Sequence, residues 1–200
     1  ALIAPLGYGK STVIQTYIQR QGQRAVTLRC AEGAAAPAVL AAALGASAPL
    51  TSDAAAAQLP AGVMLVLEDY QNWADDEANN AFLRAFLTAL DGKNPVALLT
   101  RRDAGLACDP SLLLHGTLFR IEPEDFLLPA AEAEAWLREG GVRLTGAEAQ
   151  QVDEHTRGWA AMYYLIYLHC IRGGEPAQTD VTPLMAELYR TLPETCRKLL

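Results

Sequence analysis

The sequence predicts an α/β fold, in which a parallel sheet flanked by helices is followed by a small helical domain. Up to about residue 122, short runs rich in aliphatic and β-branched residues alternate with helical patterns. The run at 62–69 is apolar and ends in acids, as expected of a parallel strand covered on both faces. Only helical patterns follow residue 122. Strands that alternate with helices favour a parallel sheet with right-handed crossovers.

The first part of the chain contains five expected strands. In chain order we expect a strand tail at 1–3, a turn at 4–9, a helix at 11–21, a strand at 24–29, two short helices within 30–60, and strands at 62–69, 95–100 and 116–121. Asp75 is the expected N-cap of a further helix, which has apolar residues at three- and four-residue spacing up to Leu90. Gly92 is expected to close that helix.

The second part is helical, and glycines separate its elements. We expect helices at 129–139, 145–156 and 159–171, a linker at 173–183, and further helical segments at 182–192 and 193–200. These patterns divide the chain into an α/β domain at 1–122, a helical domain at 123–178, and the start of a winged-helix or helical segment at 179–200. The Trp159 helix is expected to serve packing or a domain interface.

Composition narrows the class of protein. The chain has 200 residues, a net charge of −7 and 51% hydrophobic residues, which argues against disorder and against a free-standing nucleic-acid binder. Its four cysteines form no CxxC pair, which argues against a zinc site and a disulfide framework. No apolar run approaches the ~20 residues of a membrane span, and no signal peptide is recognisable. We therefore expect a cytoplasmic location and no membrane partner. Because little sequence precedes the first motif, we expect a piece of a longer protein.

The segment 4–11, Ala-Pro-Leu-Gly-Tyr-Gly-Lys-Ser, has the pattern of a phosphate-binding loop. Glycines let the backbone N–H groups curl around phosphates, a lysine neutralises their charge, a serine can ligate magnesium, and the next helix directs its N-terminus at them. Ala4 stands where the usual GxxxxGK[ST] pattern begins with glycine. The alternative is a loop with an incidental lysine. The expected nucleotide-contacting residues are Pro5, Gly7, Tyr8, Gly9, Lys10, Ser11 and Thr12.

Acids end the apolar run at 62–69, and ligands of open α/β sheets bind at such strand ends. We expect Glu68 to face magnesium through water and Asp69 to lie nearer the attacking water, so the expected metal set is Ser11, Glu68 and Asp69. Arg101 follows the next strand and could bind a γ-phosphate bidentately, which completes a catalytic set of Glu68, Asp69 and Arg101. The alternatives are ordinary strand ends with solvated side chains.

Taken in order, these motifs resemble the nucleotide-binding region of the MalT-like, LuxR-type transcriptional regulators, which are STAND-class P-loop NTPases. The family's loop reads much like APxGYGKTT, its acidic strand ends in LDDYH and its next strand ends in [ST]R. This chain has APLGYGKST, LEDYQ at 67–71 and Thr100-Arg101. The segments 144–149, 156–161 and 184–200 resemble later parts of the family, so the resemblance covers almost the whole chain. Glu68 and Gln71 depart from the family's aspartate and histidine.

The resemblance implies a P-loop NTPase that binds ATP or ADP with Mg²⁺. It also implies that Gly158 and Trp159 lie close to the adenine. In such a protein ATP holds an active form that self-associates, slow Mg-dependent hydrolysis resets it, and DNA is bound only through a domain outside this chain. Two alternatives stay open, an AAA+-type ATPase motor and a nucleotide-binding scaffold without hydrolysis, which Glu68 would permit.

Overall fold

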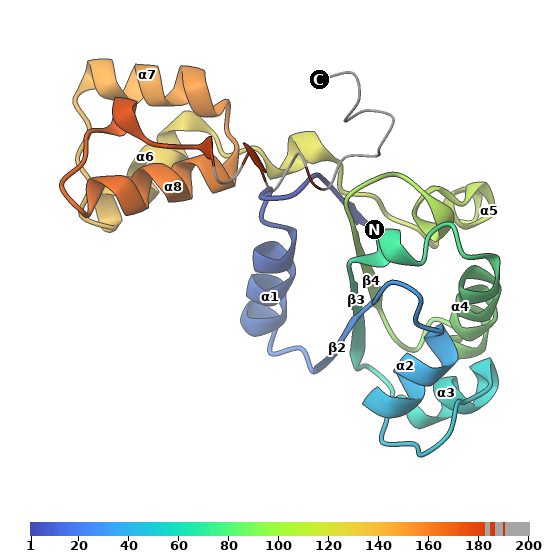
Figure 1. Cartoon of the computed structure of the whole chain (residues 1–200). Coiled ribbons are helices and arrows are strands. Elements are labelled where there is room, and N and C mark those ends of the chain that lie inside the picture. Colours follow the sequence, from blue (N-terminus) through green and yellow to red (C-terminus); the bar gives the residue numbers. More distant parts are fainter. Residues whose placement is uncertain (183–184, 187–189, 191–200) are drawn as a thin grey trace. The chain divides into compact units, whose positions relative to one another are not determined.

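The computed structural model of the chain describes residues 1–182, 185–186 and 190 (Figure 1). By their contacts, these residues form two compact units. The first comprises Ala1–Pro5 and Lys10–Pro123, and the second comprises Leu6–Gly9 and the described part of Glu124–Leu200. The phosphate-loop segment Leu6–Gly9 is thus grouped with the helical unit, although its flanking residues belong to the α/β unit.

The first unit is built on a four-stranded sheet of order β1-β4-β3-β2. All three strand pairings are parallel. The last strand in sequence is therefore inserted between the first and the third, and the carboxyl ends of all four strands lie at one edge of the sheet. The strands are β1 (Leu2–Ile3), β2 (Ala25–Arg29), β3 (Met64–Glu68) and β4 (Val96–Thr100).

Helices cover both faces of this sheet. α1 (Lys10–Gln21) lies on one face, and α2 (Ala36–Ala43), α3 (Ser52–Gln58) and α4 (Glu77–Leu90) lie on the other (Figure 1). Because successive strand residues point to opposite faces and both faces are covered, the first four residues of β3 are apolar and buried, and only the last one, Glu68, is charged. The α/β fold with a parallel sheet between helices, predicted from these runs, is confirmed.

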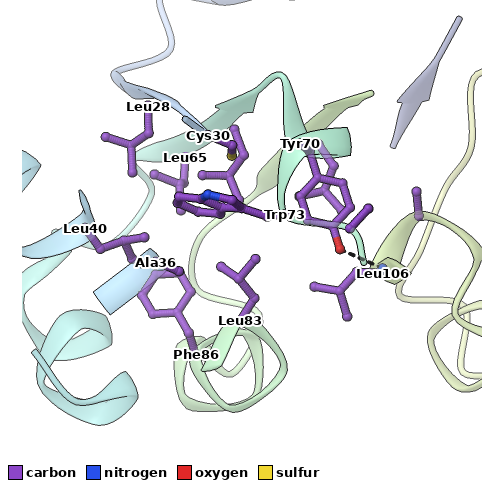
Figure 2. Close-up of a cluster of buried hydrophobic side chains, with 14 of the residues drawn as sticks. Leu28, Cys30, Ala36, Leu40, Leu65, Tyr70, Trp73, Leu83, Phe86 and Leu106 are labelled. Atoms are coloured by element: carbon purple, nitrogen blue, oxygen red, sulfur yellow. Dashed lines mark hydrogen bonds between the residues drawn. The ribbon is translucent and has the colours of Figure 1, made fainter. Parts of the chain in front are cut away.

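The larger core of this unit lies between the sheet and α2–α4 (Figure 2). Leu65 and Leu67 of β3 pack there with Leu40 of α2 and Phe86 of α4. Tyr70 is also fully buried, and its hydroxyl accepts a hydrogen bond from the backbone N–H of Leu106 over 2.8 Å (Figure 2). The Tyr70 ring thereby anchors the segment that follows β3 to the segment that follows β4.

The strand expected at 116–121 does not form. Only Ile121 joins the sheet, through a single bridge to Leu2. The N–H groups of Thr117 and Leu118 both donate to the carbonyl of Leu112, at 3.1 Å each, so they are not available to a ladder. In addition, β1 offers only a two-residue partner. Phe119, which a strand would have buried, is 79% exposed.

The N-cap expected at Asp75 lies one residue further on. Asp76 has extended backbone angles, and its carboxylate accepts a hydrogen bond from the N–H of Asn79 over 2.9 Å. Asp75 instead forms an ion pair with Arg102. Short helices that we did not expect follow the strands: η1 (Tyr70–Asn72), η2 (Gly105–Cys108), α5 (Pro110–Leu114) and η3 (Pro123–Phe126).

The second unit contains α6 (Ala130–Glu139), α7 (Gly146–Thr156), α8 (Ala160–Cys170) and η4 (Pro176–Gln178). Its small core includes Leu137, Val152 and Ile166. Thr145 and Glu148 form a capping box that fixes the start of α7. The segments expected to be helical at 182–192 and 193–200 lie almost entirely outside the described residues. Among the described residues, no helix has the length and apolarity to cross a membrane.

Candidate functional site

Lys10 begins α1, directly after the glycine-rich loop. Its Nζ donates a hydrogen bond to the carbonyl of Pro5 over 2.9 Å and a second one to the carbonyl of Ala4. Burial and, to a lesser extent, the positive charge of Arg101 lower the pKa of Lys10 to about 8, against the opposing effect of Asp69. An anion bound beside Lys10 would oppose this shift and further favour the charged form.

Asp69 joins the ends of three strands. Its Oδ2 accepts from Nε of Arg29 at the end of β2 over 2.8 Å, and its Oδ1 accepts from Nη2 of Arg101 after β4 over 3.4 Å. Gln71 donates to Asp69 Oδ1 over 3.2 Å and accepts from the backbone N–H of Arg101 over 3.2 Å. Asp69 itself has a left-handed backbone, with φ of 54°. The residue after β3 is thus tied to β2 and β4 by polar side-chain contacts.

The electrostatics of this cluster favour an ionised Asp69. Partial burial opposes ionisation, but the hydrogen bonds from Gln71 and Arg29 and the charges of Arg101 and Arg29 outweigh it, so the pKa of Asp69 lies below its ordinary value. Lys10, Arg29 and Arg101 together bring three cations to a region where Asp69 is the bonded anion. This positive region stands out in a chain whose net charge is −7.

Glu68 is the last residue of β3 and pairs in register with Arg29. Its side chain is half-buried, and the described residues provide no hydrogen bond or ion pair to its carboxylate. Glu68 is therefore the carboxylate that is free to meet a cation, whereas Asp69 is already bonded to three side chains. Ser11, in the first turn of α1, is exposed, as is its neighbour Thr12.

A magnesium site made of protein groups alone is not present in the described part of the chain, where no three His, Cys, Asp or Glu side chains cluster. Mg²⁺ bound with a nucleotide needs fewer protein ligands, because phosphate oxygens and water supply most of its coordination. The hydroxyl of Ser11 and the carboxylate of Glu68 fit that role by their chemistry. They would hold the ion against the phosphates, and the ion would neutralise phosphate charge.

The two residues after Leu99 have different partners. Thr100 is fully buried, and its hydroxyl is used in a local turn, where it donates to the carbonyl of Arg102 over 2.8 Å. Arg102 turns away to pair with Asp75. Arg101 contacts Asp69 itself, whereas Arg102 contacts the cluster through the backbone carbonyl of Gln71, to which its Nη2 donates over 3.3 Å.

Gly158 and Trp159 lie in the helical unit, at the turn between α7 and α8. Gly158 has φ of 82°, and a Cβ at this position would lie 3.0 Å from both Leu127 Cβ and Leu128 O. The carbonyl of Gly158 accepts from the N–H of Leu128 over 2.9 Å. Close packing of this turn therefore already requires a glycine. Trp159 donates from its indole nitrogen to the carbonyl of Leu6 in the phosphate-loop segment, over 3.3 Å.

Sequence reasoning missed Arg29 and gave Gln71 no role. The available signal was positional: each ends or closely follows an expected strand, at the edge of the sheet where Glu68 and Asp69 lie. What remained hidden was the strand register that puts Arg29 beside Glu68.

Comparisons with known proteins define the fold. No family pattern and no curated protein sequence matches the chain. Similar solved structures include the Walker-type ATPase PABY2304 of Pyrococcus abyssi, with a TM-score of 0.54 and 12% identity over 94% of this chain and 65% of that one. The RuvB Holliday junction branch migration motor of Thermotoga maritima has a TM-score of 0.53 and 16% identity, over 99% of this chain and 65% of that one. AMPPCP-bound DnaA from Aquifex aeolicus has a TM-score of 0.52 and 18% identity, over 86% of this chain and 56% of that one.

This chain thus spans between 56% and 65% of the length of these structures. At such identities the likeness concerns the fold. The chain has the α/β fold of P-loop, AAA+-like ATPases: a four-stranded parallel sheet flanked by helices, with a helical region after it.

Proposed function

We propose that this chain is the ATP- and ADP-binding switch module of a signal-transduction protein, with Mg²⁺ as its cofactor. The observation that carries the proposal is the group of Lys10, Arg101 and Asp69 at the carboxyl edge of the sheet, in a fold shared with P-loop ATPases. A half-buried lysine with a lowered pKa beside a second cation favours a strongly anionic ligand. The glycine-rich loop before α1 is of the type that binds a phosphate chain through its backbone N–H groups.

Each residue has a definite role in this proposal. Lys10 exchanges its carbonyl partners for phosphate oxygens, and the N-terminus of α1 adds its partial positive charge. Ser11 and Glu68 hold the magnesium ion, which neutralises the phosphates. Arg101 contacts the γ-phosphate, which only ATP carries, and so the β4 end responds differently to ATP and ADP. Pro5, Gly9 and Thr12 complete the loop that surrounds the phosphates.

Slow hydrolysis is consistent with the bonds that Asp69 already makes. Arg29, Arg101 and Gln71 take up three of the acceptor sites of its carboxylate and lower its basicity toward a water. ATP binding favours the release of Arg101, because Arg101 gains a phosphate partner in place of Asp69. Asp69 then keeps only the bonds to Arg29 and Gln71, which still slow its action on water, and hydrolysis returns Arg101 to Asp69.

The resemblance to MalT-like regulators supports the finer part of the proposal. On this basis the α/β domain at 1–122 binds nucleotide, the helical domain at 123–178 responds to it, and 179–200 begins a winged-helix or helical segment. The ATP form self-associates, and DNA is bound through a domain outside this chain. Gly158 and Trp159 belong to the nucleotide-responsive part.

A second candidate is an AAA+-type motor, which the likeness to the RuvB fold favours. A third is a scaffold that binds nucleotide without hydrolysis. ATP turnover, measured together with the nucleotide that copurifies with the chain, separates the three. The switch predicts slow turnover and retained ADP, the motor predicts rapid turnover, and the scaffold predicts none. Rapid turnover without retained ADP would reject the switch.

A further inference from the structure

Two donors from the start of α8 hold the backbone of the phosphate-loop segment Leu6–Gly9. The indole Nε1 of Trp159 donates to the carbonyl of Leu6 over 3.3 Å, and the backbone N–H of Ala161 donates to the carbonyl of Gly7 over 3.0 Å. All of these residues belong to the helical unit. Ala161 lies in the first turn of α8, where a helix leaves its backbone N–H groups without intrahelical partners. The N–H of Ala161 is thus available as a donor, and the carbonyl of Gly7 accepts from it.

The direction of these bonds matters because a trans peptide is planar, with its C=O and N–H groups pointing in opposite directions. When the Leu6 carbonyl points to Trp159, the N–H of Gly7 must point away from it. When the Gly7 carbonyl points to Ala161, the same holds for the N–H of Tyr8. Among the residues that the structure describes, the N–H groups of Gly7, Tyr8 and Gly9 have no acceptor. Such unpaired N–H groups in succession form an anion-binding concavity.

The fit between the loop and α8 is close. A Cβ at Gly7 would lie 2.6 Å from Ala161 Cβ and 3.0 Å from Trp159 Nε1, and Gly7 has φ of 80°. At Gly9, with φ of 84°, a Cβ would meet nothing within 4 Å. Gly7 is therefore needed for both backbone conformation and space, whereas Gly9 is needed for conformation only. The ring of Tyr8 also lies against Trp159, with centroids 6.3 Å apart.

We propose that Trp159 and Ala161 are positioning residues for phosphate binding, because they orient the peptide planes whose N–H groups meet the phosphates. This inference rests on the proposed nucleotide binding. It differs from a contact between Trp159 and the adenine, because it assigns the effect of Trp159 to the polyphosphate part of the ligand. Loss of the indole donor must then weaken the binding of ATP and the binding of a base-free polyphosphate by the same factor.

The test is the Trp159→Phe variant, which removes the indole N–H and keeps an aromatic ring. Calorimetry with ATP and with inorganic tripolyphosphate should show the same loss of affinity, about three- to tenfold, as expected for one neutral hydrogen bond. The matched control is Trp73→Phe, which removes an indole bond of the same kind, to the carbonyl of Ala31 over 3.0 Å in the α/β unit. It should lower thermal stability and leave both affinities unchanged.

The outcomes are distinguishable. If the wild-type chain binds neither ATP nor tripolyphosphate, the proposed function fails and the inference fails with it. If the wild type binds both and Trp159→Phe binds them equally well, only the inference is overturned. A loss for ATP alone would assign Trp159 to the base and would also overturn it.

A measurement on the free wild-type chain needs no variant and no nucleotide. Indole N–H exchange, followed by NMR, should be slow at Trp159 and fast at Trp136, whose side chain is exposed. Exchange at Trp159 as fast as at Trp136 would show that the bond to Leu6 does not persist in solution, and would overturn the proposal.

Discussion

Arg29, at the end of β2, and Asp69, just after β3, form an ion pair of 2.8 Å between Nε and Oδ2. The Arg29 side chain is 76% exposed, so salt screens the pair, and its worth is modest. The position of this ion pair matters more than its strength. It occupies one oxygen of the Asp69 carboxylate, which we propose acts on the attacking water. The other oxygen is bonded to Arg101 and Gln71.

Removing Arg29 should therefore release Asp69. We expect Arg29→Ala to increase ATP turnover by up to about fivefold, because an exposed pair contributes about 0.2–1 kcal/mol. High salt should produce a similar increase in the wild type. Arg24→Ala, at the opposite end of the β2 region, is the control and should leave turnover unchanged. Lower turnover in Arg29→Ala would mean that Arg29 assists the reaction rather than restrains Asp69.

The pH dependence of stability tests the cluster in the absence of nucleotide. The pKa of Asp69 is lowered in the folded protein from an ordinary value of 3.8, so its ionised form stabilises the fold above that value. This contribution is lost as the pH falls through the folded pKa. We expect Asp69→Asn to unfold at lower urea concentration than the wild type at pH 7, and the gap should narrow progressively as the pH falls below 3.8. An equal gap at pH 7 and pH 3 would contradict the ionic role.

Lys10 should make nucleotide affinity depend on pH. Its pKa in the free protein is about 8, and a bound phosphate would raise it. The contribution of Lys10 to ADP affinity should thus be constant below about pH 8 and should fall as the pH rises above it, with proton uptake on binding. Calorimetry in buffers of different ionisation enthalpy measures that uptake. Lys10→Met should bind weakly, without this pH dependence, and a persistent dependence would place the titrating group elsewhere.

The cap of α4 distinguishes two adjacent acids. Asp76→Ala removes the N-cap bond and should lower the free energy of unfolding by about 0.5–2 kcal/mol. Asp75→Ala removes an exposed ion pair with Arg102 and should cost less, about 0–1 kcal/mol. Urea unfolding of both variants measures the difference. A larger effect at Asp75 would contradict the observed cap.

The strands could be predicted from the sequence where the local pattern is strong. The runs that became β3 and β4 are largely apolar and buried, whereas β2 was predicted from its β-branched alternation and buries only Leu28; all three strands are confirmed. The segment 116–121 has a similar local pattern, but the carbonyl of Leu112 takes two of its N–H groups. That competition depends on the turn after α5, which local periodicity does not reveal. Asp75 and Asp76 are chemically identical candidates, and only backbone angles separate them.

The candidate site could be predicted only in part, because only some of its residues belong to local sequence patterns. The spacing around Lys10 and the acids at the end of β3 mark the site locally, because phosphate loops and strand ends have local signatures. The role of Arg29 depends on strand register, which the sequence does not encode in one place. The bond from Trp159 to Leu6 joins residues 153 positions apart. No local pattern could have identified it.

The most direct test of the central claim is calorimetric titration of ADP, in the presence of Mg²⁺, into the wild-type chain, Lys10→Ala and Lys93→Ala. Lys93 follows α4, and its exposed side chain makes it a matched control. We predict that the wild type and Lys93→Ala bind ADP alike. Lys10→Ala should bind about 10- to 100-fold more weakly, because hydrogen bonds to charged groups contribute about 1.5–3 kcal/mol. Wild-type affinity in Lys10→Ala would contradict the assignment of this loop as a nucleotide site.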